Sequence, residues 1–171
     1  MSYFFELGGI SVALHANLEF RQQYQPVVSA NTRRMMDGSL SKQSNWTRVG
    51  TSLSARGWVP HGLDGLDYSS PLLMKCGAPR AITSASNILT IPAERRADAG
   101  YEPQAYAIKN GEQIETSIGI ATNTATLGIV SAAEFYQVVY FPEITVYADP
   151  PAQDLDVHAA EYGWTLRAEQ I

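Results

Sequence analysis

Residues 134–147 read EFYQVVYFPEITVY, and this stretch decides the class of fold. Its two halves, residues 134–140 and 143–147, are rich in the aromatic and β-branched side chains that suit a pleated, half-buried strand. Pro142 cannot donate a hydrogen bond to a β-ladder, so Phe141-Pro142 predicts a bend or a bulge between the halves. The sequence therefore predicts two consecutive strands near the C-terminus.

Three hairpins are expected further out, each from a short turn signal between alternating runs. Gly8-Gly9 separates residues 3–7 from 10–14, Asp37-Gly38 separates 33–36 from 39–42, and Asn110-Gly111 separates 105–109 from 113–120. Gly, Asn and Asp tolerate the positive φ angles that tight hairpin turns require. Neighbouring strands joined in this way are antiparallel.

The remaining segments read mostly as short strands. We expect strands at residues 18–21, 46–54, 71–77, 87–91 and 162–169, short helices at 152–160 and 131–135, and a solvent-facing loop at 92–103. Many short strands at fairly regular spacing predict a mainly β protein, an antiparallel β-sandwich or barrel with one or two short helices. A chain of 171 residues suits a single domain, residues 1–171.

Composition narrows the functional classes. Charged residues make up only 17% of the chain, below the usual ~25%, so part of its surface is expected to be covered by neighbours. One cysteine, Cys76, excludes an internal disulfide framework. The start lacks a secretory signal, and no apolar run approaches the ~20 residues that cross a bilayer. We expect a soluble protein, made in a reducing cytoplasm and without a membrane partner.

Charge is distributed unevenly along the chain. Residues 1–85 hold eight Lys/Arg and five Asp/Glu, a net charge of +3, whereas residues 86–171 hold four and twelve, a net charge of −8. Such asymmetry can orient copies of one protein against each other, and chance segregation on a folded surface is the alternative. The basic half has no Lys/Arg run interleaved with aromatics, which argues against a surface that reads DNA.

The sequence offers little support for catalytic residues. Asp64 with Asp67, and Asp154 with Asp156, could pair for acid–base work, but Asp at these spacings also caps turns. His15, His61 and His158 have no metal-ligand spacing, and Cys76 lies in an apolar run that favours a small buried side chain. We predict no catalytic residue, no metal ion and no cofactor. A sugar-binding role for Trp46, Trp58 or Trp164 stays open as an alternative.

Residues 56–70 form a long loop that is too apolar for disorder. Trp and Tyr are enriched at interface hot spots. We therefore interpret the loop as a subunit-contact arm; an Ω-loop that closes its own end of the fold is the alternative. The candidate interface residues are Arg56, Trp58, Leu63, Leu66 and Tyr68.

A resemblance covers most of the chain. It is carried by LEFRQQYQPV (18–27), TRRMMDGSLSKQSNWTRVGTSLS (32–54), GWVPHGLDGLDYSSPLLMKCGAPRA (57–81), VVYFPEITVYADPP (138–151) and HAAEYGWTLRAEQI (158–171). In these segments the chain resembles small tail proteins of tailed bacteriophages, of the distal-tail or tail-tube type found in Mu-like siphophages. The resemblance implies a tail-tube-like β core whose copies close into a hexameric ring, with residues 104–120 as the candidate for the long hairpin of the ring wall.

The function expected from this resemblance is structural. The protein would be a virion component, made in the bacterial host cytoplasm, that rings the DNA channel of the distal tail, baseplate or tail tube. Its partners would be its own copies and the tube, tape-measure and baseplate-hub proteins, and DNA would pass without sequence-specific binding. The acidic half would face the channel, because a basic lining would hold DNA. The alternatives are a head–tail joining or tail-completion ring protein, a carbohydrate-binding β-sandwich module and, last, a glycosidase that uses Asp64 and Asp67.

Overall fold

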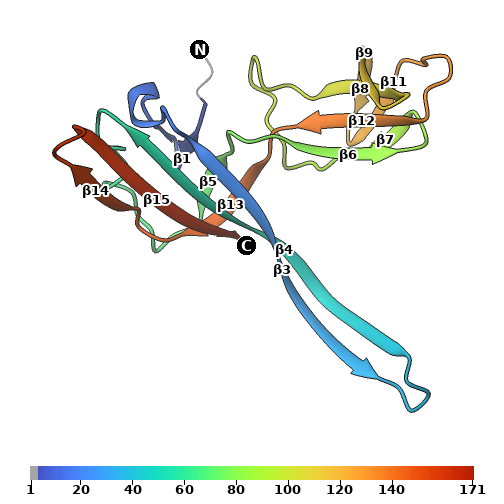
Figure 1. The fold of residues 1–171 in the computed structure, drawn as a ribbon, viewed down its shortest axis with the longest axis horizontal. Helices are drawn as coiled ribbons and strands as arrows, with labels where there is room; N and C mark the ends of the chain where they lie inside the picture. The colour runs from blue at the N-terminus through green and yellow to red at the C-terminus, as the bar shows by residue number, and fades with distance from the viewer. Residues whose placement is uncertain (1–3) are drawn as a thin grey trace. The chain divides into compact units, whose positions relative to one another are not determined.

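A computed structural model describes residues 4–171 and is almost entirely β, with 57% of residues in strands and 2% in helix (Figure 1). The predicted mainly β, antiparallel class is therefore confirmed. The described sheets are consistent with a β-sandwich, and none of them closes into a barrel. The strands are β1 (Glu6–Leu7), β2 (Ile10–Ser11), β3 (Arg21–Arg34), β4 (Leu40–Gly57), β5 (Leu72–Lys75), β6 (Arg80–Ser84), β7 (Ile88–Thr90), β8 (Gln104–Lys109), β9 (Glu112–Thr116), β10 (Ile118–Ala121), β11 (Thr124–Leu127), β12 (Phe135–Tyr140), β13 (Glu143–Ala148), β14 (Ala152–Asp156) and β15 (Glu161–Gln170). No helix among residues 4–171 is long and apolar enough to span a bilayer.

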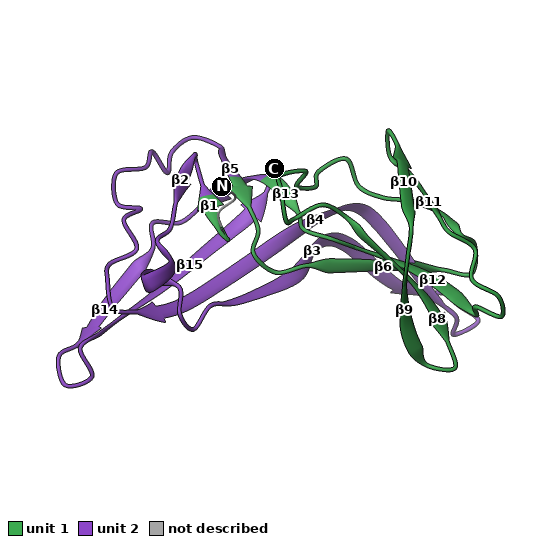
Figure 2. Cartoon of the chain, turned by 90° about the horizontal axis from the view of Figure 1, so that it is seen from above, with its two compact units in different colours: residues 1–6, 74–144 green, residues 7–73, 145–171 purple. Residues whose placement is uncertain are grey.

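The chain divides into two compact units, which Figure 2 colours separately. Unit 1 consists of residues 1–6 and 74–144, and unit 2 consists of residues 7–73 and 145–171. Each unit is therefore built from segments that are distant in the sequence.

Unit 1 contains a small sandwich of two antiparallel sheets. One sheet has the order β6-β12-β8-β9 and the other has the order β10-β11-β7. Their buried side chains form one hydrophobic cluster, which consists of Leu89, Ile91, Ala105, Ala107, Ala125, Leu127, Tyr136 and Val138. Both sheets contribute to this cluster, so apolar burial between the two sheets stabilises the unit.

Unit 2 contains most of an eight-stranded sheet with the order β2-β1-β5-β13-β15-β4-β3, in which β14 also pairs with β15. Side chains alternate between its faces, as the period of a strand requires. On the inner face Leu53 of β4 and Leu166 of β15 are directly paired and buried, whereas the neighbouring pair Ser52 and Arg167 faces outward. The inner face is thus apolar and the outer face polar.

The sequence located the turns correctly. Asn110-Gly111 joins β8 to β9, and Asp37-Gly38 lies in the turn between β3 and β4. Gly8 and Gly9 join β1 to β2, but that hairpin is shorter than expected, and Tyr3 lies outside the described residues. Phe141-Pro142 separates β12 from β13, and these two strands belong to different sheets, so the predicted break is confirmed.

Both expected helices are wrong. Residues 152–156 form β14, which pairs with β15 from Ala152–Thr165 to Asp156–Glu161, and the carboxylate of Asp156 then accepts hydrogen bonds from the turn that follows. Residues 131–134 form a turn in which Ala132 has a φ of 61°, a value that a right-handed helix excludes. The described residues hold one helical turn, the 3₁₀ segment η1 (Leu14–Ala16).

Gly57 at the end of β4 marks a close approach of two backbones. A Cβ at this position would lie 2.0 Å from the carbonyl oxygen of His15 and 2.7 Å from the Cα of Ala16. We expect Gly57→Ala to lower the free energy of unfolding by about 2 kcal/mol or more, because backbone must move to admit the methyl group. Urea denaturation checks this, with Gly65→Ala as the control, since nothing lies within 4 Å of a Cβ there. Equal stability of the two variants would contradict the expectation.

Candidate assembly interface

The longest hairpin of the chain is β3–β4, and its outer part has no core. Strand β3 has 14 residues and β4 has 18, and they pair antiparallel along their length. Every residue from Ala30 to Arg48 is exposed. No other element of unit 2 runs beside this part of the ribbon, among the residues that the structure describes (Figure 1). We call residues 30–48 the arm.

Local interactions define the end of the arm. Gly38 has a φ of 83°, and the carboxylate of Asp37 accepts hydrogen bonds from the backbone N–H of Ser39 at 2.9 Å and from its hydroxyl at 2.7 Å. The hydroxyl hydrogen bond, followed by the backbone one, lowers the pKa of Asp37. Pairing shifts by one residue after Ser29–Trp46, because Asn45 is an extra residue in β4. This bulge marks where the arm leaves the sheet.

The arm is both basic and apolar. It contains four Lys/Arg and one Asp, a net charge of +3, so the other residues of the chain sum to −8. Its large exposed apolar side chains are Met35, Met36, Leu40 and Trp46. An isolated two-stranded hairpin is at best marginally stable in water. Apolar side chains on such a ribbon are typical of a segment that a partner covers.

Part of the loop at residues 56–70 packs against its own unit. Leu63 is fully buried, and the hydroxyl of Tyr68 donates a 2.9 Å hydrogen bond to the carbonyl oxygen of Leu63. Burial followed by the charge of Asp64 raises the pKa of Tyr68. Leu66 is half-buried and would meet a Cβ at Gly8 within 2.8 Å. Leu63 is therefore a core residue of its own subunit. Leu66 and Tyr68 are partly buried against the same subunit.

A buried histidine holds this loop in place. His61 is 2% exposed, its Nδ1 accepts a 2.9 Å hydrogen bond from the N–H of Leu63, and its ring lies 5.8 Å from that of Trp164. The indole of Trp164, buried in the core, donates a hydrogen bond to the carbonyl oxygen of Ala16 at 3.0 Å. The loop and the segment that carries η1 thus cover the inner face of the sheet.

Trp58 contrasts with the buried His61 and Leu63 of the same loop. Trp58 is 62% exposed, and its ring stacks on that of His15 with the ring centroids 5.7 Å apart. The backbone N–H of Trp58 donates a hydrogen bond to the carbonyl oxygen of His15. Leu14, Leu18 and Val59 are also exposed nearby in the same two segments. We call these five residues the Trp58 patch. A cluster of this kind is the sort of surface that a partner covers.

Arg56, two positions before Trp58 in the same loop, is exposed. It lines a hollow of about 460 Å³ on the outer face of the sheet, together with Glu19, Arg21, Ser54, Ala55, Asp154, Gly163, Trp164 and Thr165. A second, larger hollow of about 700 Å³ lies on the same sheet, where Arg167, Asp149 and Glu169 are among the lining residues. Both hollows are open to solvent, and each mixes cationic and anionic side chains, so neither has the enclosed apolar character of a small-molecule pocket.

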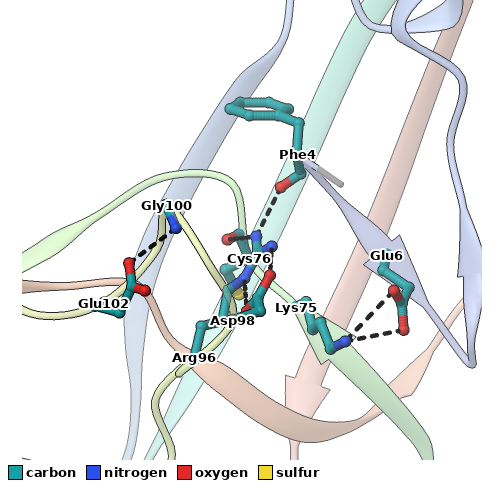
Figure 3. Close-up of polar contacts among 8 residues, drawn as sticks. All are labelled: Phe4, Glu6, Lys75, Cys76, Arg96, Asp98, Gly100 and Glu102. Atoms are coloured by element: carbon teal, nitrogen blue, oxygen red, sulfur yellow. Dashed lines mark hydrogen bonds and ion pairs between the residues drawn. The ribbon is translucent and has the colours of Figure 1, made fainter. Parts of the chain in front are cut away.

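Arg96 is the feature that sequence reasoning missed. Residues 92–103 are a loop, as expected, but the prediction that the loop faces solvent is wrong for Arg96, which is fully buried. Its guanidinium donates to the carbonyl oxygens of Phe4 at 2.9 Å and Cys76 at 3.1 Å, and to both carboxylate oxygens of Asp98 (Figure 3). The ring of Tyr101 lies 3.5 Å from the guanidinium carbon.

This cluster is structural in character. The guanidinium of Arg96 donates to two backbone carbonyls and to both carboxylate oxygens of Asp98, and it connects the segment at Phe4 to the loop at Cys76 within unit 1. Burying a charge is tolerated where it is paired and hydrogen-bonded in this way. The arginine therefore ties the segment at Phe4 to the loop at Cys76.

The expected catalytic candidates do not converge on one site. Asp67 caps the turn at Ser69 and Ser70, as predicted, and the hydroxyl of Ser69 contributes most to lowering its pKa. Cys76 is buried, as predicted. Within residues 4–171, no three His, Cys, Asp or Glu side chains gather closely enough to hold a metal ion.

Comparisons with known proteins add no identification. No protein-family model matches the chain, and no curated protein sequence matches it.

Proposed function

We propose that this protein is a structural component of a phage tail that assembles with its own copies into a hexameric ring around the DNA channel. The ring would lie in the distal tail, the baseplate or the tail tube. Its further partners would be tube, tape-measure and baseplate-hub proteins. In this role the protein performs no catalysis and uses no cofactor.

The arm is the observation that carries the proposal. A ribbon in which every residue from Ala30 to Arg48 is exposed gains little from its own chain. The arm needs a partner to bury its apolar side chains. Its net charge of +3 against −8 for the rest of the chain makes an identical copy a suitable partner. The assignment to a phage tail, within the class of assembling proteins, rests on the sequence resemblance.

The β3–β4 hairpin replaces residues 104–120 as our candidate for the long hairpin of the ring wall. Sequence reasoning favoured residues 104–120, but the hairpin of β8 and β9 there has strands of only six and five residues. The β3–β4 hairpin is much longer and is the better candidate. The acidic second half of the chain, with a net charge of −8, would face the channel, where it would repel phosphate.

Sedimentation velocity and negative-stain microscopy of the purified protein test the proposal. We expect assembly that increases with protein concentration and images of closed rings or stacked tubes, because the arm and its acceptor lie on identical subunits. A monomer at every concentration would overturn the proposal. Rings that bind head-connector proteins rather than tube proteins would favour the head–tail joining alternative.

The exposed ring of Trp58 supports one competing function. Its stacked position beside His15 leaves the indole largely exposed, which suits stacking on a sugar. A glycan array separates the two functions: specific binding that Trp58→Ala abolishes, by a protein that stays monomeric, would favour the carbohydrate-binding module. Trp46→Ala is the matched control, because Trp46 is also exposed but lies on the arm.

A further inference from the structure

The arm and the Trp58 patch lie at opposite ends of the same two strands. The arm holds the end of β3 and the start of β4, whereas β3 begins three residues after Leu18 and β4 ends one residue before Trp58. A strand of 14 residues, the length of β3, is about 45 Å long at ~3.3 Å per residue. The tip of the arm therefore cannot reach the patch of its own subunit.

The two surfaces have matching chemistry. The tip presents Met35, Met36 and Leu40, which are exposed and flexible enough to fit an irregular surface. The patch presents apolar side chains around Trp58, of which Leu14 is 70% exposed. Both are apolar clusters at the ends of one sheet, and neither is covered by the described residues of the chain.

The charges around these clusters are opposite. The arm carries a net charge of +3, with Arg33 and Arg34 next to the two methionines. The segments that form the patch, residues 13–20 and 58–70, contain three carboxylates and no Lys or Arg, a net charge of −3. The carboxylates are Glu19, Asp64 and Asp67, and the Asp64 side chain is 86% exposed. Opposite charges around an apolar centre are the arrangement that specifies partner and register.

We propose that the tip of the arm docks on the Trp58 patch of a second copy of this chain. The inference rests on the proposed homomeric assembly and names the surfaces that form it. The contact joins two different surfaces, so it is heterologous and repeats from copy to copy. A repeated heterologous contact closes into a ring when the rotation between copies permits closure.

Cysteine cross-linking tests the contact directly. Met36→Cys and Val59→Cys are placed on two chains with different tags, mixed and oxidised. Native Cys76 is buried and stays in both chains. We expect a cross-linked dimer that contains both tags, since the two side chains meet at the proposed contact. The control replaces Val59→Cys with Ile114→Cys, an apolar position in unit 1 with nearly the same exposure (39% against 37%), and it should give no mixed dimer.

A charge exchange gives a second, independent readout. Arg33→Glu with Arg34→Glu, and separately Glu19→Lys with Asp64→Lys, should each weaken association about tenfold or more, because like charges then face each other. Mixing the two doubly substituted chains should restore association. Arg80→Glu with Lys109→Glu removes the same amount of positive charge from unit 1 and should have little effect.

The outcomes separate this inference from the proposed function. Rings that form without the mixed cross-link and ignore the charge exchange would overturn the docking inference and leave the ring intact. A monomer that forms no cross-link at any concentration would overturn both. Binding to a glycan array or to anionic lipid vesicles that Val59→Asp abolishes, with no cross-link, would assign the patch to another partner and overturn the inference.

Discussion

Arg96→Met is expected to lower the free energy of unfolding of unit 1 by about 3 kcal/mol. The substitution removes the charge that neutralises Asp98 and the hydrogen bonds that Arg96 donates to the carbonyl oxygens of Phe4 and Cys76. Removing one partner of a buried ion pair costs about 3–5 kcal/mol, and we take the lower end because the Asp98 side chain is 27% exposed. Urea denaturation followed by tryptophan fluorescence and by circular dichroism measures the loss.

A matched variant separates burial from charge. Lys75 pairs with Glu6 at 3.4 Å in the same unit, but both side chains are partly exposed. Lys75→Met should cost only about 1 kcal/mol or less, because solvent screens this pair. Hydrogen exchange adds a local readout: the amide of Phe5 should exchange faster in Arg96→Met than in Lys75→Met. Equal losses in the two variants would show that Arg96 contributes no more than a surface charge.

Shortening the arm is expected to abolish assembly and leave the fold intact. Ala30 and Ser44 are directly paired, so an Asn-Gly turn can replace residues 31–43 and close the ribbon at that pair. All the deleted residues are exposed, so the free energy of unfolding should change by less than about 1 kcal/mol. Sedimentation velocity should show a monomer where the full chain forms rings.

A substitution in a second hairpin serves as the control for the arm. The β8–β9 hairpin also ends in an exposed Asn-Gly turn, at Asn110-Gly111, and Glu112→Ala beside it should leave assembly unchanged. Normal rings from the shortened-arm chain would contradict the role given to the arm. Loss of cooperative unfolding in that chain would instead show that the arm supports the fold of its own subunit.

Turn chemistry made much of the fold predictable. Gly38, Asn110 and Gly111 have positive φ angles that only a few residues accept, so the two hairpins could be located from the sequence. The length of the arm could not be predicted, because residues 30–48 lack the apolar alternation that marks a strand over a core. The same lack of alternation agrees with a ribbon that covers no core of its own subunit.

Long-range partners explain what the sequence could not show. A short helix was the expectation for residues 152–160, but pairing of residues 152–156 with β15 overrides that weak local preference. Arg96 looked like a solvent-facing charge because its acceptors come from Phe4 and Cys76, which are 92 and 20 residues away. The loop at residues 56–70 was identified as apolar, but only the structure separates buried Leu63 from exposed Trp58.

The extra residue at Asn45 has a mechanical consequence. Because one strand of the ribbon is a residue longer than the other at that point, the ribbon twists there more strongly than an unbroken ladder. The single extra residue Asn45 therefore sets the orientation of the tip of the arm, including Met35 and Met36, relative to the sheet. Deleting or inserting one residue at this position would therefore rotate the tip of the arm relative to the sheet, although no buried side chain would have changed.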